Sequence, residues 1–297
     1  MRVVVTGAGG RLAHVLLPVL CADPDVARVI GVDRRAPAFR HPKLEAAIAD
    51  IGEARARASV RGADALVHLA SVVLRGRMPV REMARTNVDA TRALLSEAAA
   101  AGVPAVVHMS SAAVYGPGVD LAEDAPLAPL ARFHYACQKA EIDAWLACEL
   151  PRAAVLRPTI VLGPHAQPLL RQIAALPLYP RLPEPQPRLQ FVHEDDVAQA
   201  VVLALRRRAA GPFNLAAPST FSLRELAQAR HPRAPAVPLA LARALLELAW
   251  RTAGWGGEPG WFDGIASPLT LDCRRARSLL GWAPRHEDWR EIAGARA

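Results

Sequence analysis

The first half of the chain alternates between short, almost continuously apolar segments and longer segments in which apolar residues recur with helical spacing. Apolar segments without alternating polar positions are typical of parallel strands that are buried on both faces of a sheet. The pattern therefore predicts an α/β fold, with a doubly wound parallel sheet and helices on both of its faces. The expected strands are residues 2–6, 26–32, 65–69, 105–109 and 153–156, and the expected helices are residues 12–20, 83–101 and 135–150.

The second half of the chain has a different texture. Residues 164–192 are rich in proline and predict an irregular connection. Asp196 is expected to cap an apolar helix at residues 197–205, and Ser222 with Glu225 has the form of a capping box at the start of another helix. Further ordered segments are expected at residues 213–215, 239–250 and 267–282.

The composition is that of an ordinary globular protein of 297 residues, 52% hydrophobic and 22% charged. The formal net charge is +8, but the arginines are scattered singly and form no basic arm or stripe, so no nucleic acid is expected as a partner. Four widely spaced cysteines without CxxC spacing argue against a disulfide framework and for a reducing cytoplasm. The chain begins directly with an apolar strand, and the apolar run at residues 16–20 is too short to span a bilayer, so no membrane is expected either.

Residues 6–13, Thr-Gly-Ala-Gly-Gly-Arg-Leu-Ala, join the first strand to the first helix through a glycine-rich turn. Glycines are needed where the backbone turns sharply and approaches a pyrophosphate at a helix N-terminus. The second strand ends at Asp33, whose carboxylate can accept hydrogen bonds from both hydroxyls of an adenosine ribose and would repel a 2′-phosphate. These features predict a dinucleotide site that prefers NAD. NADP stays open as an alternative, because Arg34 or Arg35 could contact a 2′-phosphate.

Tyr135 and Lys139 are four residues apart in a helix-favouring segment, so both side chains are expected on one face of that helix. A nearby ammonium stabilises phenolate over phenol, so Lys139 is expected to lower the pKa of Tyr135 from its reference value of about 10. Tyr135 is therefore a candidate acid/base residue for proton transfer, with Lys139 as its tuner. The alternative is an unrelated tyrosine and lysine on a surface helix.

Taken in order, these features resemble the short-chain dehydrogenase/reductase superfamily, specifically its extended subgroup, the NAD-dependent epimerase/dehydratase family. The resemblance covers nearly the whole chain and depends on an ordered set of motifs. It implies a Rossmann-type NAD-binding domain at residues 1–163, to which residues 190–215 contribute elements, and a small substrate-binding lobe formed mainly by residues 164–297. The motifs are TGxxGxxA at residues 6–13, Asp33, Asp50-Ile51, His68-Leu69-Ala70, Asn87-Val88, SSAAVYG at residues 110–116, Tyr135-x-x-x-Lys139, Leu156-Arg157-Pro158, Gly163-Pro164, FVHEDDV at residues 191–197 and Leu280-Gly281-Trp282-x-Pro284.

The family pattern implies a role for individual residues. Tyr135 would exchange a proton with the substrate oxygen while the nicotinamide exchanges a hydride, and Lys139 would hold the nicotinamide ribose. Ser111 would hydrogen-bond the reacting oxygen, with backbone capping as its alternative role. The implied cofactor-binding residues are Gly7, Gly9, Gly10, Arg11, Leu12, Asp33, Arg34, Asp50, Ile51, Leu69, Ala70, Asn87, Tyr135, Lys139 and Pro158, and the candidate substrate-binding residues are Ser111, Ala112, Tyr115, His165 and Arg188.

Two departures from the family pattern bear on the reaction. Ala112 stands where dehydratase relatives place an acid, which disfavours a sugar dehydratase. Residues 164–192 lack the longer insertions by which many relatives bind a nucleoside diphosphate, and Arg188 is one residue out of place. The expected function is NAD-dependent oxidation or reduction at a secondary alcohol or ketone, either as a nucleotide-sugar 4-epimerase or as a net dehydrogenase or ketoreductase. The second would act on a smaller or apolar substrate, steroid-like or polyketide-derived, and a non-catalytic NAD(P)-sensing protein is a third alternative.

Two further expectations concern metal ions and assembly. Residues 193–196, His-Glu-Asp-Asp, resemble a metal cluster, but consecutive residues there point in different directions, so no metal is expected. The family resemblance implies a homodimer that pairs the helices of the Asn87 region and of Tyr135. The residues compatible with such a face, or equally with the core, are Leu94, Leu95, Ala98 and Trp145.

Overall fold

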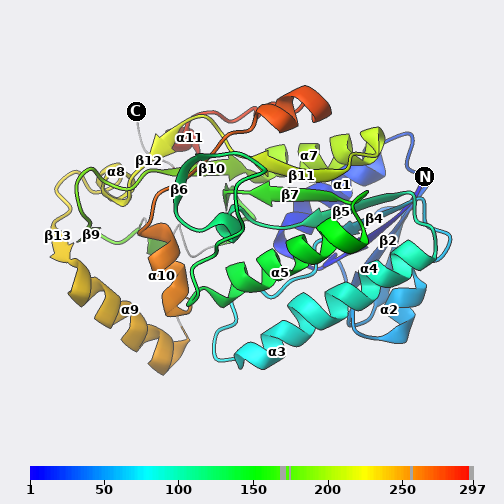
Figure 1. Ribbon diagram of the computed structural model, residues 1–297, viewed down its shortest axis with the longest axis horizontal. Coiled ribbons are helices and arrows are strands. Elements are labelled where there is room, and N and C mark those ends of the chain that lie inside the picture. The colour runs from blue at the N-terminus through cyan, green and yellow to red at the C-terminus, as the bar shows by residue number, and fades with distance from the viewer. Residues whose placement is uncertain (168–171, 174, 255–256, 294–297) are drawn as a thin grey trace.

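A parallel sheet of seven strands forms the centre of the computed structural model, which describes residues 1–167, 172–173, 175–254 and 257–293 (Figure 1). The strand order is β11-β7-β5-β4-β1-β2-β3, and each neighbouring pair is parallel. The doubly wound parallel sheet expected from the apolar segments is therefore confirmed. The strands are β1 (Arg2–Thr6), β2 (Arg28–Asp33), β3 (Leu44–Ile48), β4 (Ala65–His68), β5 (Ala105–Met109), β7 (Ala154–Pro158) and β11 (Gly211–Leu215).

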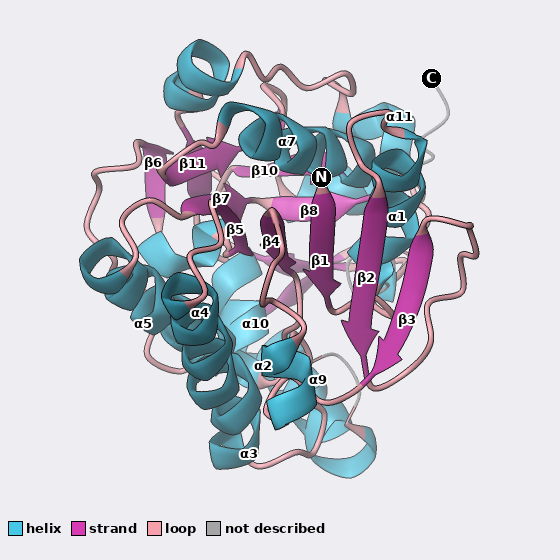
Figure 2. Ribbon diagram, turned by 90° about the vertical axis from the view of Figure 1, so that its right-hand side faces the viewer, coloured by secondary structure: helices cyan, strands magenta, loops and turns pink. Residues whose placement is uncertain are grey.

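Helices cover both faces of this sheet (Figure 2). On one face lie α1 and α7, and on the other face lie α2, α4 and α5. The helix expected at residues 83–101 is a continuous helical segment of α3, a π-helical turn and α4. The bounds are α1 (Arg11–Ala22), α2 (Ala54–Ala58), α3 (Val80–Ala84), the π-helical turn (Arg85–Ala90), α4 (Thr91–Ala100), α5 (His134–Glu149) and α7 (Glu194–Arg207).

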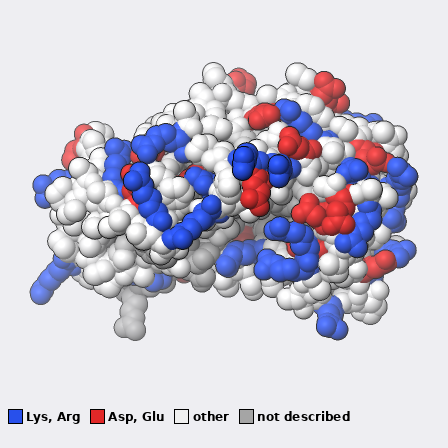
Figure 3. Space-filling model, turned by 90° about the horizontal axis from the view of Figure 1, so that it is seen from below, with Lys and Arg blue, Asp and Glu red and all other residues white. Residues whose placement is uncertain are grey.

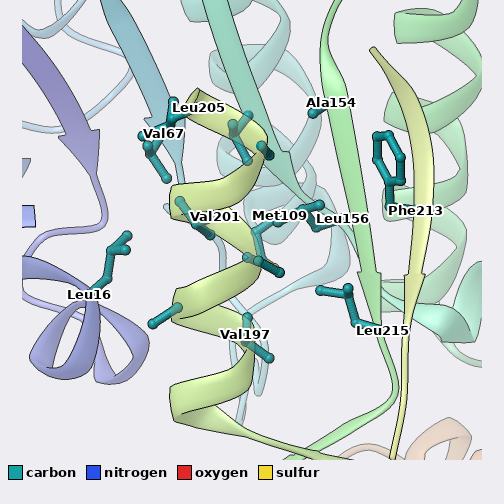
Figure 4. Packing of buried hydrophobic residues seen from close by; sticks show 14 of the residues in the cluster. Leu16, Val67, Met109, Ala154, Leu156, Val197, Val201, Leu205, Phe213 and Leu215 are labelled. Carbon is teal, nitrogen blue, oxygen red and sulfur yellow. The ribbon is translucent and has the colours of Figure 1, made fainter. Parts of the chain in front are cut away.

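The two helical layers bury opposite sides of the same strands. Val3 and Val5 of β1 pack into the cluster with α1 and α7, whereas Val4 between them packs into the cluster with α2, α4 and α5. Figure 4 shows α7 laying its apolar side chains over the sheet. Residues buried on both faces explain why the strands are apolar throughout. The α7 residues labelled there are Val197, Val201 and Leu205, and they face Val67, Met109 and Leu156.

The α4 residues considered for a dimer face lie in the core of the chain itself. Leu94, Leu95 and Ala98 are completely buried within the layer of α2, α4 and α5. Trp145 is partly buried and packs against the same cluster. Leu94, Leu95 and Ala98 therefore stabilise the chain itself, whereas Trp145 keeps an exposed part, and the expected homodimer stays a prediction.

A smaller lobe lies beyond the carboxyl ends of the main strands and contains most of the second half of the chain (Figure 1). The lobes exchange strands, because β6 from the first half belongs to the smaller lobe and β11 from the second half is the edge of the main sheet. One small sheet has the order β12-β10-β14-β6 with β8 paired to β10, and another pairs β13 with β9. The bounds are β6 (Gly118–Leu121), β8 (Ile160–Leu162), β9 (Tyr179–Arg181), β10 (Leu189–His193), β12 (Thr220–Phe221), β13 (Ala236–Pro238), β14 (Leu269–Leu271), α8 (Leu223–Gln228), α9 (Leu239–Ala253), α10 (Pro259–Ile265), α11 (Trp289–Ala293), a 3₁₀ turn (Ala112–Tyr115) and a second π-helical turn (Ala276–Leu280).

Part of the connection expected to be irregular is ordered into strands. β9 and the first residues of β10 fall within residues 164–192, while residues 168–171 and 174 of that segment lie outside the described part of the chain. β9 and β13 both contain a proline and, among the described residues, form a sheet of two strands. Proline has no N–H group to donate to a neighbouring strand, so it is tolerated at edge positions, where one side of the strand needs no donor.

The start of α7 differs from the expectation. His193, and not Asp196, is the N-cap, since its Nδ1 atom accepts a hydrogen bond from the Asp195 backbone N–H at 3.2 Å. The buried carboxylate of Asp196 instead accepts hydrogen bonds from the backbone N–H groups of Arg285 and His286. Asp196, in the first turn of α7, therefore anchors the C-terminal segment and does not cap the helix. The capping box at α8 is confirmed.

The surface carries charges of both signs. On the face drawn in Figure 3, lysines and arginines are interspersed with aspartates and glutamates. Within the described residues, none of the helices has the length and apolar character that a bilayer crossing requires.

Candidate active site

A cavity of about 880 Å³ lies between the main sheet and the smaller lobe. The glycine turn after β1 and residues that follow β4, β5 and β7 form one side of it, and residues of α10 and β14 form the other. Open α/β sheets bind their ligands at this edge, outside the carboxyl ends of the strands. The cavity therefore lies where the predicted dinucleotide site and catalytic residues would have to meet.

The glycine turn forms a backbone cradle that side chains would fill. Gly7 has a φ angle of +74°, and a Cβ atom there would lie 2.7 Å from the backbone nitrogen of Ala70. A Cβ atom on Gly10 would lie 2.8 Å from the carbonyl oxygen of Gly7. No side chain caps α1 and its first turn contains no acid, so its N-terminal N–H groups can receive an anion. Gly7, Gly9, Gly10, Arg11 and Leu12 all line the cavity, and this arrangement fits a pyrophosphate.

Asp33 ends β2 beside this cradle. Its carboxylate accepts hydrogen bonds from the backbone N–H groups of Gly9, at 3.1 Å, and Arg35, at 3.0 Å. These bonds hold the carboxylate next to the turn, where an adenosine ribose would lie. Arg34 and Arg35 line the cavity, and the Arg34 guanidinium is 4.0 Å from the Asp50 carboxylate. Both the acid that favours NAD and the arginines that would accept NADP are thus in place.

Tyr135, Lys139 and Asp143 are spaced four residues apart along α5 and form one buried stripe. Tyr135 and Lys139 line the cavity. The Lys139 ammonium donates a hydrogen bond of 2.7 Å to the carbonyl oxygen of Met109 and lies 5.8 Å from the centre of the Tyr135 ring. Burial lowers the pKa of Lys139 from 10.5 to about 8, and the carboxylate of Asp143 opposes this shift.

The expected lowering of the Tyr135 pKa is wrong for this structure. Burial raises the pKa of Tyr135 above its ordinary value, the Asp143 carboxylate raises it further, and interaction with the Ser111 hydroxyl offsets part of the rise. Lys139 does not reverse this direction because its ammonium lies over the ring and donates to a backbone carbonyl. Tyr135 is therefore held as a neutral phenol, which is a proton donor.

Ser111 caps a turn and also lines the cavity, so the alternative of backbone capping is confirmed and the contact with a reacting oxygen stays a prediction. Its hydroxyl oxygen accepts a hydrogen bond of 3.2 Å from the Ala113 backbone N–H and so caps the 3₁₀ turn after β5. The same side chain lines the cavity and interacts with the Tyr135 hydroxyl. Capping fixes the position from which Ser111 would meet a reacting oxygen. Ala112, the neighbouring candidate, also lines the cavity.

His68 and Asn87 support the site from beneath. The two ring nitrogens of His68 lie 2.7 Å from the hydroxyl of Thr6 and 3.0 Å from that of Thr91. Burial lowers the pKa of His68 to about 3, so its ring is neutral and serves to hold Thr6 and Thr91. The side chain of Asn87 contacts both backbone polar groups of Val72 and thereby fixes the loop after β4 that lines the cavity.

Several candidates lie outside the described lining of the cavity. Tyr115 is buried, and its hydroxyl donates to Asn214 at 2.8 Å and accepts from Arg157 at 2.7 Å, so it is part of the core and does not shape the pocket. Arg188 binds Glu225 at 2.7 Å as well as the hydroxyl and carbonyl oxygens of Thr220, and it is not part of the described lining. The cofactor candidates found outside the lining are Asp33, Asp50, Ile51, Ala70 and Asn87, whereas Leu69 and Pro158 are part of it.

His165 also lies outside the lining, but it is in contact with two residues of the cavity. Its Nδ1 atom is 2.9 Å from the Glu194 carboxylate, and its ring stacks on that of His14 with centroids 5.4 Å apart. Glu194 and His14 line the cavity. His165 therefore positions residues of the wall and does not itself face the ligand space.

The apolar wall at the catalytic end was not found from the sequence. It comes from the loop after β4, from Phe133 before α5 and from Trp261 on α10. A proline at the first position of α10, directly after Glu258, is the one local signal of that helix. The loop residues that line the wall are Val72, Val73, Leu74 and Met78.

Two residues of the His-Glu-Asp-Asp segment at 193–196 lie close to each other and to His286. His193 Nδ1 is 3.4 Å from the Asp195 carboxylate, and Nε2 of His286 is 3.8 Å from the same carboxylate. The side chains of His193, Asp195 and His286 are close enough to share an ion. His193 and Asp195 both belong to the His-Glu-Asp-Asp segment, so the expectation that side chains of this segment point in different directions is wrong for these two. The Nδ1 atom of His193 is already the acceptor of the α7 N-cap bond.

Comparisons with known proteins agree with this architecture. The chain matches the model of the NAD dependent epimerase/dehydratase family over residues 3–216. It is 30% identical over 326 residues to a protein of a Streptomyces species named 3-diazoavenalumate denitrifying reductase, and the match covers 99% of both chains. It also matches an uncharacterized protein of Mycobacterium tuberculosis at 27% identity, over 88% of this chain but only 28% of that protein.

Solved structures share the fold along the whole chain. DesIV, a dTDP-glucose 4,6-dehydratase from Streptomyces venezuelae solved with NAD and TYD bound, superposes with a TM-score of 0.76 at 25% identity, covering 99% of this chain and 95% of that one. MoeE5 in complex with UDP-glucuronic acid and NAD has a TM-score of 0.76 at 24% identity, covering 100% and 97%. Both likenesses include the main sheet and the smaller lobe.

Proposed function

Because the chain belongs to the NAD-dependent epimerase/dehydratase family, we propose that it is an NAD-dependent oxidoreductase acting at a secondary alcohol or ketone. One observation carries the proposal: Ser111, Tyr135 and Lys139 line the same cavity as the glycine cradle. A hydride carrier and a proton carrier are the two components that such a reaction needs.

The residues of the chain divide the work between binding and proton transfer. When bound, NAD supplies the hydride acceptor or donor at C4 of its nicotinamide. The cradle of Gly7, Gly9 and Gly10 receives the pyrophosphate, and Asp33 accepts hydrogen bonds from the adenosine ribose. Lys139 holds the nicotinamide ribose. Tyr135 exchanges the proton with the substrate oxygen.

The resting protonation state of Tyr135 fits the reductive direction. Burial keeps it a neutral phenol at neutral pH, which is the form that would donate a proton to the oxygen of a ketone as hydride arrives at its carbon. Ser111 would hold that oxygen during the transfer. In the oxidative direction the phenolate form would accept the proton of the alcohol.

A nucleotide-sugar 4-epimerase is the second candidate. Its support is that MoeE5 was solved with UDP-glucuronic acid beside NAD, and that DesIV is a dTDP-glucose 4,6-dehydratase solved with NAD and TYD. The cavity lining favours the net reductase instead. Among its described residues, Arg11, Arg34 and Arg35 lie at the cofactor cradle and Lys139 lies beside Tyr135, which leaves the substrate end without an arginine for a second diphosphate.

Two further features of this proposal concern assembly and location. We expect a homodimer in the cytoplasm, formed through exposed residues of α4 and α5. Sedimentation of the purified protein measures its oligomeric state, and a single monomeric species would contradict the homodimer.

The proposal is tested by binding and turnover in parallel. Titration of NADH and NADPH, followed by cofactor fluorescence, should show tighter binding of NADH. Turnover of NADH with a panel of ketones, and NAD-dependent epimerisation of UDP-glucose, should each fall by about 10²- to 10⁴-fold in Tyr135→Phe, since general acid–base catalysis contributes that much. Binding of NADH should be retained in the same variant.

Tyr179→Phe is the matched control, because Tyr179 is also buried but belongs to the smaller lobe and lies outside the cavity lining. Undiminished turnover in Tyr135→Phe would exclude the catalytic role of Tyr135. Binding of NADH without turnover of any probe in wild type would leave an NAD-sensing protein. Failure to bind either dinucleotide would exclude both the enzyme and the sensor.

A further inference from the structure

The short helix α10 is packed unusually closely against the start of the catalytic helix α5. A Cβ atom on Gly260 would lie 2.2 Å from the carbonyl oxygen of Arg132, and one on Gly264 would lie 3.1 Å from the Phe133 ring. These glycines are four residues apart, so they lie on one face of α10. They allow a helix of the smaller lobe to approach the backbone that leads directly into Tyr135.

Glu258, the N-cap residue of α10, ties this helix to both neighbouring segments. Its side chain is 2% exposed, and its carboxylate accepts hydrogen bonds from Arg75 Nε at 2.5 Å and from the His134 backbone N–H at 3.1 Å. The His134 ring nitrogen Nδ1 is 2.9 Å from the same carboxylate. Arg75 belongs to the loop after β4, and His134 directly precedes Tyr135. One buried carboxylate therefore joins α10, the lining loop and the catalytic helix.

This packing of α10 places Trp261 in the lining of the cavity. Its ring stacks beside that of Tyr135, with centroids 5.7 Å apart and an interplanar angle of 24°. The Phe133 ring lies 4.7 Å from the Trp261 ring at 58°. All three rings line the cavity, and the Gly264 position adds no side chain there.

The surroundings of these rings are apolar. Val72, Val73, Leu74 and Met78 from the loop after β4 belong to the same packing cluster as Phe133 and Tyr135 or line the cavity beside it. A sugar ring presents hydroxyl groups on every edge and would leave many of them without partners on such a wall. A flat aromatic ring would be accommodated by stacking and by burial of its faces.

We propose that the catalytic end of the cavity is selective for a carbonyl group attached to a flat aromatic ring. Trp261 is the specificity-determining residue that contacts this ring, and Glu258 is a positioning residue that acts through α10. This inference rests on the proposed function and narrows its substrate class.

The chemical step is the reduction of an aryl ketone to a secondary alcohol. The carbonyl carbon gains a hydride from NADH, which is oxidised to NAD, and the carbonyl oxygen gains the proton of the Tyr135 hydroxyl. Solvent returns a proton to Tyr135. One ketone, one NADH and one proton give one alcohol and one NAD.

The test uses naphthyl methyl ketone and decahydronaphthyl methyl ketone as probes, since the two have the same carbon skeleton and differ in the aromaticity and flatness of the rings next to the same carbonyl group. Binding of each probe to the NADH-loaded protein is measured by calorimetry, and kcat/KM is measured by NADH consumption. We expect wild type to prefer the naphthyl probe by tenfold or more. Trp261→Ala should reduce that preference by about tenfold in both assays, whereas Trp261→Phe should keep most of it, because stacking with an aromatic side chain contributes an effect of this order.

Trp145→Phe is the control, since Trp145 packs within the layer of α2, α4 and α5 and lies outside the cavity lining. Glu258→Gln should raise KM for the naphthyl probe and lower the preference while leaving the NADH affinity unchanged. A purely structural role would lower the urea midpoint without changing the preference, and that result would overturn the assignment of Glu258.

The outcomes separate this inference from the proposed function. Equal binding of the two probes in wild type, or a preference unchanged in Trp261→Ala, would overturn the aromatic site even if NADH-dependent turnover of another ketone is found. Absence of NADH binding would instead contradict the proposed function, and calorimetry of the probes with the protein alone would still decide the inference. Tighter binding of UDP-glucose than of either probe would also overturn it.

Discussion

The buried ammonium of Lys139 predicts a stability that rises with pH in the alkaline range. Lys139 is 4% exposed, and burial lowers its pKa in the folded protein to about 8. In the unfolded chain the same group titrates at its ordinary value of 10.5. Between these two values the unfolded state binds more protons than the folded state, so the free energy of unfolding increases with pH. Below pH 8 the penalty for burying the charge is fully present.

The size of the effect follows from the two pKa values. Each pKa unit corresponds to about 1.36 kcal/mol, so the shift from 10.5 to about 8 is worth about 3 kcal/mol. The Lys139→Met variant removes the titrating group and keeps a side chain of similar length. Relative to this variant, wild type should gain about 3 kcal/mol of unfolding free energy between pH 7 and pH 11.

Urea denaturation of both proteins at several pH values, followed by tryptophan fluorescence, measures this difference. Subtracting the two curves removes the contributions of the other groups that titrate in this range, including Tyr135. The loss of the hydrogen bond to the Met109 carbonyl offsets the curves by a constant but does not change their slopes. A difference that stays flat between pH 8 and pH 10.5 would refute the reasoning and would mean that Lys139 is solvated.

Three further predictions concern the cofactor and the core. Asp33→Ser should shift the ratio of NADPH to NADH affinity toward NADPH by tenfold or more, because it removes a charge that repels a 2′-phosphate beside Arg34 and Arg35. An unchanged ratio in fluorescence titrations would show that Asp33 does not face the ribose. Arg157→Met should lower the free energy of unfolding by about 3–5 kcal/mol, since it leaves the buried Asp143 carboxylate without its partner at 2.8 Å. Replacing Asp143 by Leu in the same protein should restore much of this loss in urea denaturation. Trp282→Ala should cost about 3–5 kcal/mol because the ring is completely buried, and a smaller loss would mean that the cavity it leaves collapses.

The cofactor half of the site could be predicted from the sequence because its chemistry is local. A glycine turn between a strand and a helix places backbone N–H groups within eight residues, and the acid that follows ends the neighbouring strand. In the structure, Asp33 hydrogen-bonds the backbone of Gly9, as this local arrangement requires. Tyr135 and Lys139 are likewise four residues apart on one helix, so their shared face follows from helix geometry alone.

The substrate half could not be predicted in this way because it is assembled from distant segments. Trp261 reaches Tyr135 through a contact between residues 126 positions apart in the chain, and only the packing of α10 brings them together. The pKa of Tyr135 was mispredicted for a related reason. Spacing places Lys139 near the ring, but burial by residues elsewhere in the sequence determines which protonation state is stable. Tyr115 and Arg188 have motif-like positions, yet their partners Asn214 and Thr220 lie far along the chain.

The exchange of strands between the lobes limits how this protein can be divided or recombined. A fragment that ends at residue 163 would lack β11 and α7, which would expose the open edge of β7 and the apolar surface that Val197 and Val201 cover. Exposed edges and apolar faces promote aggregation. Replacing the smaller lobe with that of another protein would therefore require replacing β6 as well and keeping β11 in place. Substrate range in this chain can change by replacing single side chains of the wall, but not by exchanging the smaller lobe as one contiguous piece of gene.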